Sequence, residues 1–182
     1  MHFNHYGGVA AELAVRLVNA APDEDLGRLL AEIGYKPIGV IDARQDAELR
    51  RWIRELDAAF RDPSVERLNV LLAKTTGRPY ISVHDGRAPH LHYSEETAPV
   101  DERVKAYTAF GLATLFCDAP TRIGRCARDG CDTVFVDTSR NGKRRFCTTQ
   151  CSTRVHVAEH RRRTASRHEA AGSEQTAGVA GM

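Results

Sequence analysis

Four of the five cysteines lie within 26 residues near the carboxyl end, in the pattern C-x4-C-x15-C-x3-C. Two cysteine pairs at this distance suit four thiolates around one tetrahedral zinc ion. Structural disulfides would need an oxidising compartment, and a redox pair would want C-x-x-C beside a βαβ pattern. Four protein ligands leave no open coordination position, so the pattern predicts one structural Zn²⁺. The ligands would be Cys126, Cys131, Cys147 and Cys151.

The residues around these cysteines predict the local structure. Asp129-Gly130 favours a tight turn between the first two cysteines, and Thr133–Val136 reads as a strand. Asn141-Gly142 favours a hairpin turn, which would make Arg144–Phe146 the return strand. Cys147 and Cys151 are one helical turn apart, and Thr148 could cap a helix that begins there. The sequence therefore predicts a treble-clef-like zinc finger made of a β-hairpin and a helix.

The first 120 residues predict a mainly α domain in an α+β chain. Apolar residues recur at helical spacing over 8–20, 23–34, 49–60, 65–72 and 99–117, with Asp23 and Ser64 as N-caps. Between the last two helices, Tyr80–Val83 and a return strand through Leu91 and Tyr93 flank Asp85-Gly86, a hairpin signal. Cys117 ends an apolar helical run, and we expect it to be a small core residue.

Charge divides the chain into two parts. Residues 1–120 carry a net charge of −4, and residues 121–182 carry +6. We expect a helical domain over 1–120, the zinc finger over 121–164 and a disordered tail over 165–182.

The first residues lack a signal-peptide pattern and no run is apolar enough to span a membrane, so a cytoplasmic, nucleoid-associated protein is expected.

The cysteine segment resembles the CGNR zinc finger, found at the C-terminus of bacterial proteins that begin with an ABATE domain. The resemblance implies an ABATE-like domain over residues 1–120 and the function of a stress-induced transcription regulator. The tetrad reads Cys-Ser-Thr-Arg over 151–154 instead of Cys-Gly-Asn-Arg, and Phe146 replaces a tryptophan. Asn19 matches one polar position of an early family segment. The matching finger positions are Arg125, Cys126, Cys131, Phe135, Asp137, Ser139, Arg144, Arg145, Phe146, Cys147, Cys151 and Arg154.

Basic residues surround the cysteines and predict DNA binding, since zinc would hold them on a rigid scaffold suited to phosphate contacts. Alternatives are a basic face that binds an acidic protein or that serves only solubility. Asp137 is expected to organise the hairpin or a neighbouring arginine. The candidate DNA-contacting residues are Arg140, Lys143, Arg144, Arg145, Arg154, Arg161, Arg162 and Arg163.

The helical domain is expected to sense a small-molecule effector or to form a homodimer. Its candidate ligand edge is His84, His90 and His92, of which the last two would share one strand face. Such histidines are more often solvent-facing hairpin residues. The sequence shows no phosphate-binding glycine loop and no nucleophile elbow, so we do not expect an enzyme. The less favoured alternative is an enzyme that uses a pocket of the N-terminal domain.

Overall fold

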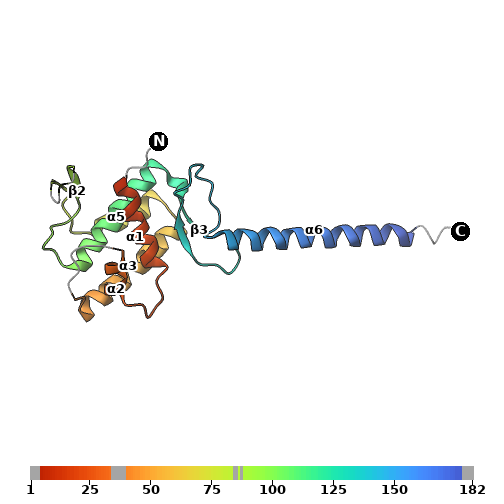
Figure 1. The fold of residues 1–182 in the computed structure, drawn as a ribbon, viewed down its shortest axis with the longest axis horizontal. Helices are drawn as coiled ribbons and strands as arrows, with labels where there is room; N and C mark the ends of the chain where they lie inside the picture. Colours follow the sequence, from red (N-terminus) through yellow and green to blue (C-terminus); the bar gives the residue numbers. More distant parts are fainter. Residues whose placement is uncertain (1–4, 34–39, 84–85, 87, 178–182) are drawn as a thin grey trace.

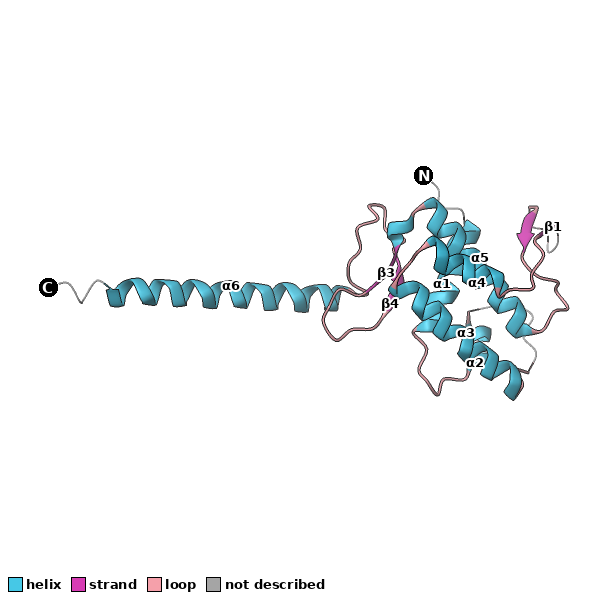
Figure 2. Ribbon diagram, turned by 180° about the vertical axis from the view of Figure 1, so that it is seen from behind, coloured by secondary structure: helices cyan, strands magenta, loops and turns pink. Residues whose placement is uncertain are grey.

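The structure is a computed structural model that describes residues 5–33, 40–83, 86 and 88–177. A bundle of helices forms the body of the molecule, and a long helix projects from one end of it (Figure 1). A small hairpin lies at the opposite end of the body, as the view from behind also shows (Figure 2). The described part of the chain is thus mostly helical with two small antiparallel hairpins, as the sequence predicts.

The helices follow one another in the order that the sequence periodicity predicts, and the differences from the prediction are described below. No helix of the described residues combines the length and the apolar character needed to cross a membrane. The helices and strands are α1 (His5–Val18), α2 (Leu26–Glu32), α3 (Ala43–Arg61), α4 (Val65–Ala73), β1 (Tyr80–Ser82), β2 (His90–His92), α5 (Val100–Asp118), the 3-10 helix η1 (Pro120–Arg122), β3 (Ile123–Arg125), β4 (Val134–Val136) and α6 (Thr149–Ala177).

Side-chain caps fix the start of three of these helices. Asp42 accepts a hydrogen bond from the backbone N–H of Gln45 at 2.7 Å, and the Gln45 side chain accepts one from the N–H of Asp42 at 3.1 Å. This reciprocal capping box begins α3. Ser64 caps α4 as predicted. The predicted cap Asp23 is wrong: Asp25 caps α2, so this helix begins two residues later.

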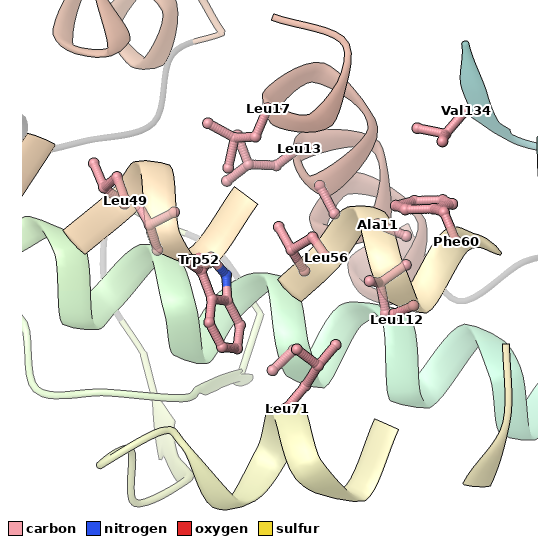
Figure 3. Packing of buried hydrophobic residues seen from close by; sticks show 14 of the residues in the cluster. Ala11, Leu13, Leu17, Leu49, Trp52, Leu56, Phe60, Leu71, Leu112 and Val134 are labelled. Carbon is pink, nitrogen blue, oxygen red and sulfur yellow. The ribbon is translucent and has the colours of Figure 1, made fainter. Parts of the chain in front are cut away.

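The core of the body lies between α1, α3, α4 and α5, and its labelled side chains converge in Figure 3. Leu17, Leu56 and Leu112 are fully buried. The Trp52 indole donates a hydrogen bond of 2.9 Å to the Thr108 hydroxyl, so the core satisfies this polar group. Helices α1 and α5 approach each other closely at Gly111, where a Cβ atom would overlap Ala10.

The strands β1 and β2 pair antiparallel, with Ile81 opposite Leu91. Both of these side chains are exposed, at 71% and 49%, so the hairpin leaves one apolar face uncovered. The pairing of Ser82 with His90 leaves a longer connection than a two-residue turn. Gly86 has a φ of 68° within this connection, whereas Asp85 lies outside the described residues.

The second hairpin corrects the predicted strand order of the finger. The strand β4 forms as predicted, but it pairs with β3, with Gly124 opposite Phe135. The predicted return strand, Arg144–Phe146, is a loop. Gly124 has a packing reason to be glycine, because a Cβ atom there would lie 3.2 Å from the Phe135 ring.

The long helix α6 and the end of α5 also differ from expectation. Helix α6 runs to Ala177, so residues 165–177 are helical where the sequence predicts disorder. Alanine, glutamate, glutamine and arginine dominate this segment and are good helix formers. Cys117 is exposed rather than a core residue. It faces away from the buried Leu112 and Leu115 on the last turn of α5.

Candidate metal centre

The four predicted cysteine ligands come together from three different local structures. Cys126 follows β3, and Cys131 follows a turn in which its N–H donates to the carbonyl of Arg128 at 3.0 Å. Gly130 adopts a φ of 73° in this turn, as the Asp-Gly signal predicts. Cys147 and Cys151 flank the start of α6, where the Thr148 hydroxyl accepts from the Cys151 N–H at 3.2 Å. The predicted cap is therefore confirmed.

The spacing of the four sulfur atoms fits a tetrahedral zinc ion. All four Sγ atoms lie within 4.8 Å of one another. Three separations between Cys131, Cys147 and Cys151 are 3.6, 3.7 and 4.0 Å. Zinc–thiolate bonds of about 2.3 Å place tetrahedral sulfurs about 3.8 Å apart. The residues thus fit one structural Zn²⁺, which would cross-link the β3 end, the turn and the base of α6.

The thiols around the centre differ in how readily they ionise. Hydrogen bonding to Thr133 lowers the pKa of Cys131 to about 6, whereas burial raises the pKa of Cys147 to about 12. The Thr148 hydroxyl and then Arg128 lower the pKa of Cys151. Without metal the Cys147 thiol therefore keeps its proton at neutral pH, and a zinc ion binding here would displace it.

Arg128 is a neighbour of the metal centre that the cysteine pattern did not reveal. Its Nε atom donates to the Cys151 Sγ atom at 3.2 Å, and this contact with Cys151 raises the pKa of the guanidinium. Four thiolates around Zn²⁺ carry a net charge of about −2. A guanidinium beside them offsets part of that charge and holds the Cys151 side chain in place.

Asp137 organises the loop that leads to the second cysteine pair, as predicted. Its carboxylate is buried and accepts from the backbone N–H groups of Ser139 at 2.9 Å and Arg144 at 2.8 Å. Burial raises the pKa of Asp137, but the hydrogen bonds from Ser139 and Arg144 outweigh it and the net shift is downward. Arg122 also donates to the backbone carbonyls of Asp137 and Ser139.

The strand β4 connects the metal centre to the helical body. Its three residues are all buried, and alternate side chains point to opposite faces. Val134 and Val136 pack into the main core, whereas Phe135 packs with Cys126, Cys147 and Cys151. The finger is therefore built onto the helical body rather than joined to it by a linker.

Two polar contacts reinforce this attachment. The Asn19 amide pairs with both backbone groups of Val134, donating to its carbonyl and accepting from its N–H, each at 2.9 Å. Asn19 thus satisfies the backbone groups of Val134, on the strand that β3 pairs with. Arg125 forms an ion pair with Asp57 of α3 and another with Asp132 at 3.1 Å.

The eight candidate DNA-contacting side chains are all exposed, and they fall into two groups. Arg140, Lys143, Arg144 and Arg145 lie on the loop before α6, and the others lie on α6 itself. Arg144 already contacts the finger: its guanidinium donates to the carbonyls of Phe146 and Cys147 and lies 4.8 Å from the centre of the Phe135 ring. This arginine holds the loop against the metal centre.

The candidate histidine edge lies on the first hairpin, far from the metal centre along the body (Figure 1). His90 and His92 share one face of β2, and their Nε2 atoms are 3.0 Å apart. His84 falls outside the described residues. Among the residues that the structure describes, the four cysteines are the one cluster of three or more metal-binding side chains.

Sequence reasoning missed Arg122, Arg128 and the Arg125–Asp57 ion pair. These arginines lie within or beside the cysteine spacing, but arginine is frequent throughout the chain, so its position alone carried no signal. The sequence marks Asn19 only as a polar position shared with the family, and it does not predict the contact of Asn19 with Val134.

Comparison with known proteins supports the zinc-finger assignment. A search of curated proteins found no match to this chain. Residues 122–164 match the sequence model of the CGNR zinc finger family, and this segment contains all four cysteines and the first half of α6. The carboxyl-terminal part of the chain is therefore a CGNR-type zinc finger.

Proposed function

We propose that this chain is a zinc-dependent DNA-binding transcription regulator in which the finger loop and α6 contact DNA. The observation that carries the proposal is the projecting, basic α6. Arg154 and Arg161–Arg163 are exposed on a helix that stands clear of the body (Figure 2). An α-helix fits the major groove of B-DNA, and arginine pairs with phosphate or guanine in a bidentate manner.

The metal centre supports this role by fixing the direction of α6. Cys147 and Cys151 hold the base of the helix, while β4 anchors the same centre in the main core. The loop residues Arg140, Lys143 and Arg145 lie next to that base and would contact the flanking phosphates. Arg144 would act indirectly, by holding the loop. Three consecutive arginines cover most of the helix circumference, so we assign them to backbone contacts rather than to base recognition.

The helical body would sense an effector or form a homodimer, and the chain would act by binding rather than by catalysis. Its attachment to the finger supports this division, because Asn19, directly after α1, and Asp57 of α3 both contact the β3–β4 hairpin. A change in the body would then reach the base of α6 through buried contacts. Such a protein would associate with the nucleoid.

The test is DNA binding measured by fluorescence anisotropy as a function of salt concentration, with zinc-loaded protein. Each arginine that contacts a phosphate contributes about 0.9 to the slope of log K against log salt. Replacing Arg161–Arg163 with alanine should therefore lower the slope by about 2.7. The matched control removes the same charge from the helical body, at Arg28, Arg54 and Arg67, and should leave the slope unchanged.

Two results would refute the proposal. One is the absence of DNA binding at low salt by fully zinc-loaded protein. The other is an equal loss of binding in the two triple variants, since that would show an effect of net charge rather than of α6. Binding of an acidic protein that DNA does not displace would favour a protein-interaction module instead.

A further inference from the structure

The histidine pair on β2 has a hydrogen-bonding arrangement that suits a metal ion. His90 Nδ1 lies 3.0 Å from the carbonyl oxygen of Ala88. A carbonyl oxygen only accepts hydrogen bonds, so His90 Nδ1 carries a hydrogen atom. In the neutral ring the Nε2 atom then has a lone pair, and it points at His92 Nε2, 3.0 Å away.

The other nitrogen of His92 also has partners suited to this arrangement. Its Nδ1 atom lies 3.4 Å from the Tyr80 hydroxyl and 3.9 Å from the Glu96 carboxylate. With a hydrogen on Nε2, His92 can donate to His90. With the hydrogen on Nδ1, toward the Tyr80 hydroxyl, both Nε2 atoms carry a lone pair. Metal-binding histidines usually donate their second N–H to a carbonyl, a carboxylate or water, and the Ala88 carbonyl accepts from His90 in this way.

The type of donor atom indicates which ions would fit. Imidazole nitrogen is a ligand for Ni²⁺, Cu²⁺ and Zn²⁺, and the affinity of such a site is highest for Cu²⁺. The two Nε2 atoms, 3.0 Å apart, are close enough for one ion to take the place of the hydrogen between them.

We propose that His90 and His92 form a two-histidine site for a divalent transition-metal ion, Ni²⁺ or Cu²⁺, separate from the four-cysteine centre. His92 is largely buried, with 19% of its side chain exposed, whereas Glu96 is 60% exposed. Water molecules would complete the coordination.

The test uses the zinc-loaded full chain, labelled with ¹⁵N at histidine, and titrates it with Ni²⁺. Zinc content is measured before and after, so that the cysteines stay occupied. Ni²⁺ should shift or broaden the ring signals of His90 and His92 first. Replacing either histidine with alanine should weaken the tightest Ni²⁺ binding by about tenfold or more, as two ligands become one.

The matched control is the variant His156→Ala/His160→Ala, which removes an exposed histidine pair one turn apart on α6. It should keep the tight Ni²⁺ site. The proposal is overturned if Ni²⁺ perturbs only the α6 histidines, or if His90→Ala and His92→Ala bind Ni²⁺ as tightly as the parent. Circular dichroism of each variant shows whether it is folded, and the two single variants provide independent tests.

Discussion

Replacing Asn19 with alanine should separate the contribution of the finger attachment from that of the metal. The Asn19 amide makes two hydrogen bonds of 2.9 Å to the backbone of Val134, a residue that is only 1% exposed. A typical hydrogen bond contributes about 0.5–1.5 kcal/mol to stability. Asn19 itself is exposed, so water can partly replace the lost partners. We therefore expect the free energy of unfolding to fall by about 1–3 kcal/mol.

The assay is urea denaturation of zinc-loaded protein, followed by tryptophan fluorescence, since Trp52 lies in the main core. The matched control is Asn69→Ala on α4, because Asn69 is exposed on that helix. It should change stability by less than about 0.5 kcal/mol. Hydrogen exchange at the Val134 amide should accelerate in Asn19→Ala, while the zinc content stays at one ion per chain.

A loss below about 0.5 kcal/mol in Asn19→Ala would refute the reasoning, because two such bonds cannot then be holding the edge of β4. An equal loss in Asn69→Ala would also contradict it. Loss of zinc from Asn19→Ala would show that the attachment and the metal site are not separable.

Three further predictions concern the metal, the core and the loop. Zinc affinity, measured by competition with a chelator, should rise at least about tenfold per pH unit from pH 6 to 8, because zinc displaces protons from buried thiols such as Cys147; a flat profile would contradict this. Thr108→Val should cost about 1–3 kcal/mol in thermal unfolding, since it leaves the Trp52 indole N–H unpaired, and unchanged stability would show that the indole finds another acceptor. The lowered pKa of Asp137 means that its stabilising effect is complete above its ordinary value near 3.8 and is lost as pH falls through the lower, folded-state pKa. The free energy of unfolding of Asp137→Asn should accordingly be lower than that of the parent at neutral pH, and this difference should shrink in acid. Equal stability of the two proteins at pH 7 would refute this role.

The predicted helices depended on local information. The predicted cap Ser64 and the apolar period of α3 lie within a few residues of the structure that they specify. The predicted β4 is similarly apparent from Val-Phe-Val. Its partner β3, in contrast, reads Ile-Gly-Arg and carries no strand signal, so the Asp129-Gly130 turn between the two strands predicted only the approach of the first two cysteines. The Asn-Gly signal at 141–142 pointed instead to a hairpin that the structure does not form, and Gly142 serves a loop turn with a φ of 59°.

The exposure of Cys117 and the extent of α6 were also not readable from the sequence. Helical spacing shows which residues share a face, but it does not show where the covering elements end. Cys117 lies on the last turn of α5, on the side that no helix covers. Residues 165–177 lack an apolar face, and their helix continues from the turns that the metal centre fixes.

The sequence by itself determined the metal ligands and the type of the helices, because thiolate spacing and helix caps operate over short stretches of chain. Only the tertiary structure decided how the finger is held. Asn19 and Val134 are 115 residues apart, and Asp57 and Arg125 are 68 apart. Such contacts depend on the packing of α1 and α3 against β3 and β4. That packing buries both faces of β4 and makes one strand part of two cores.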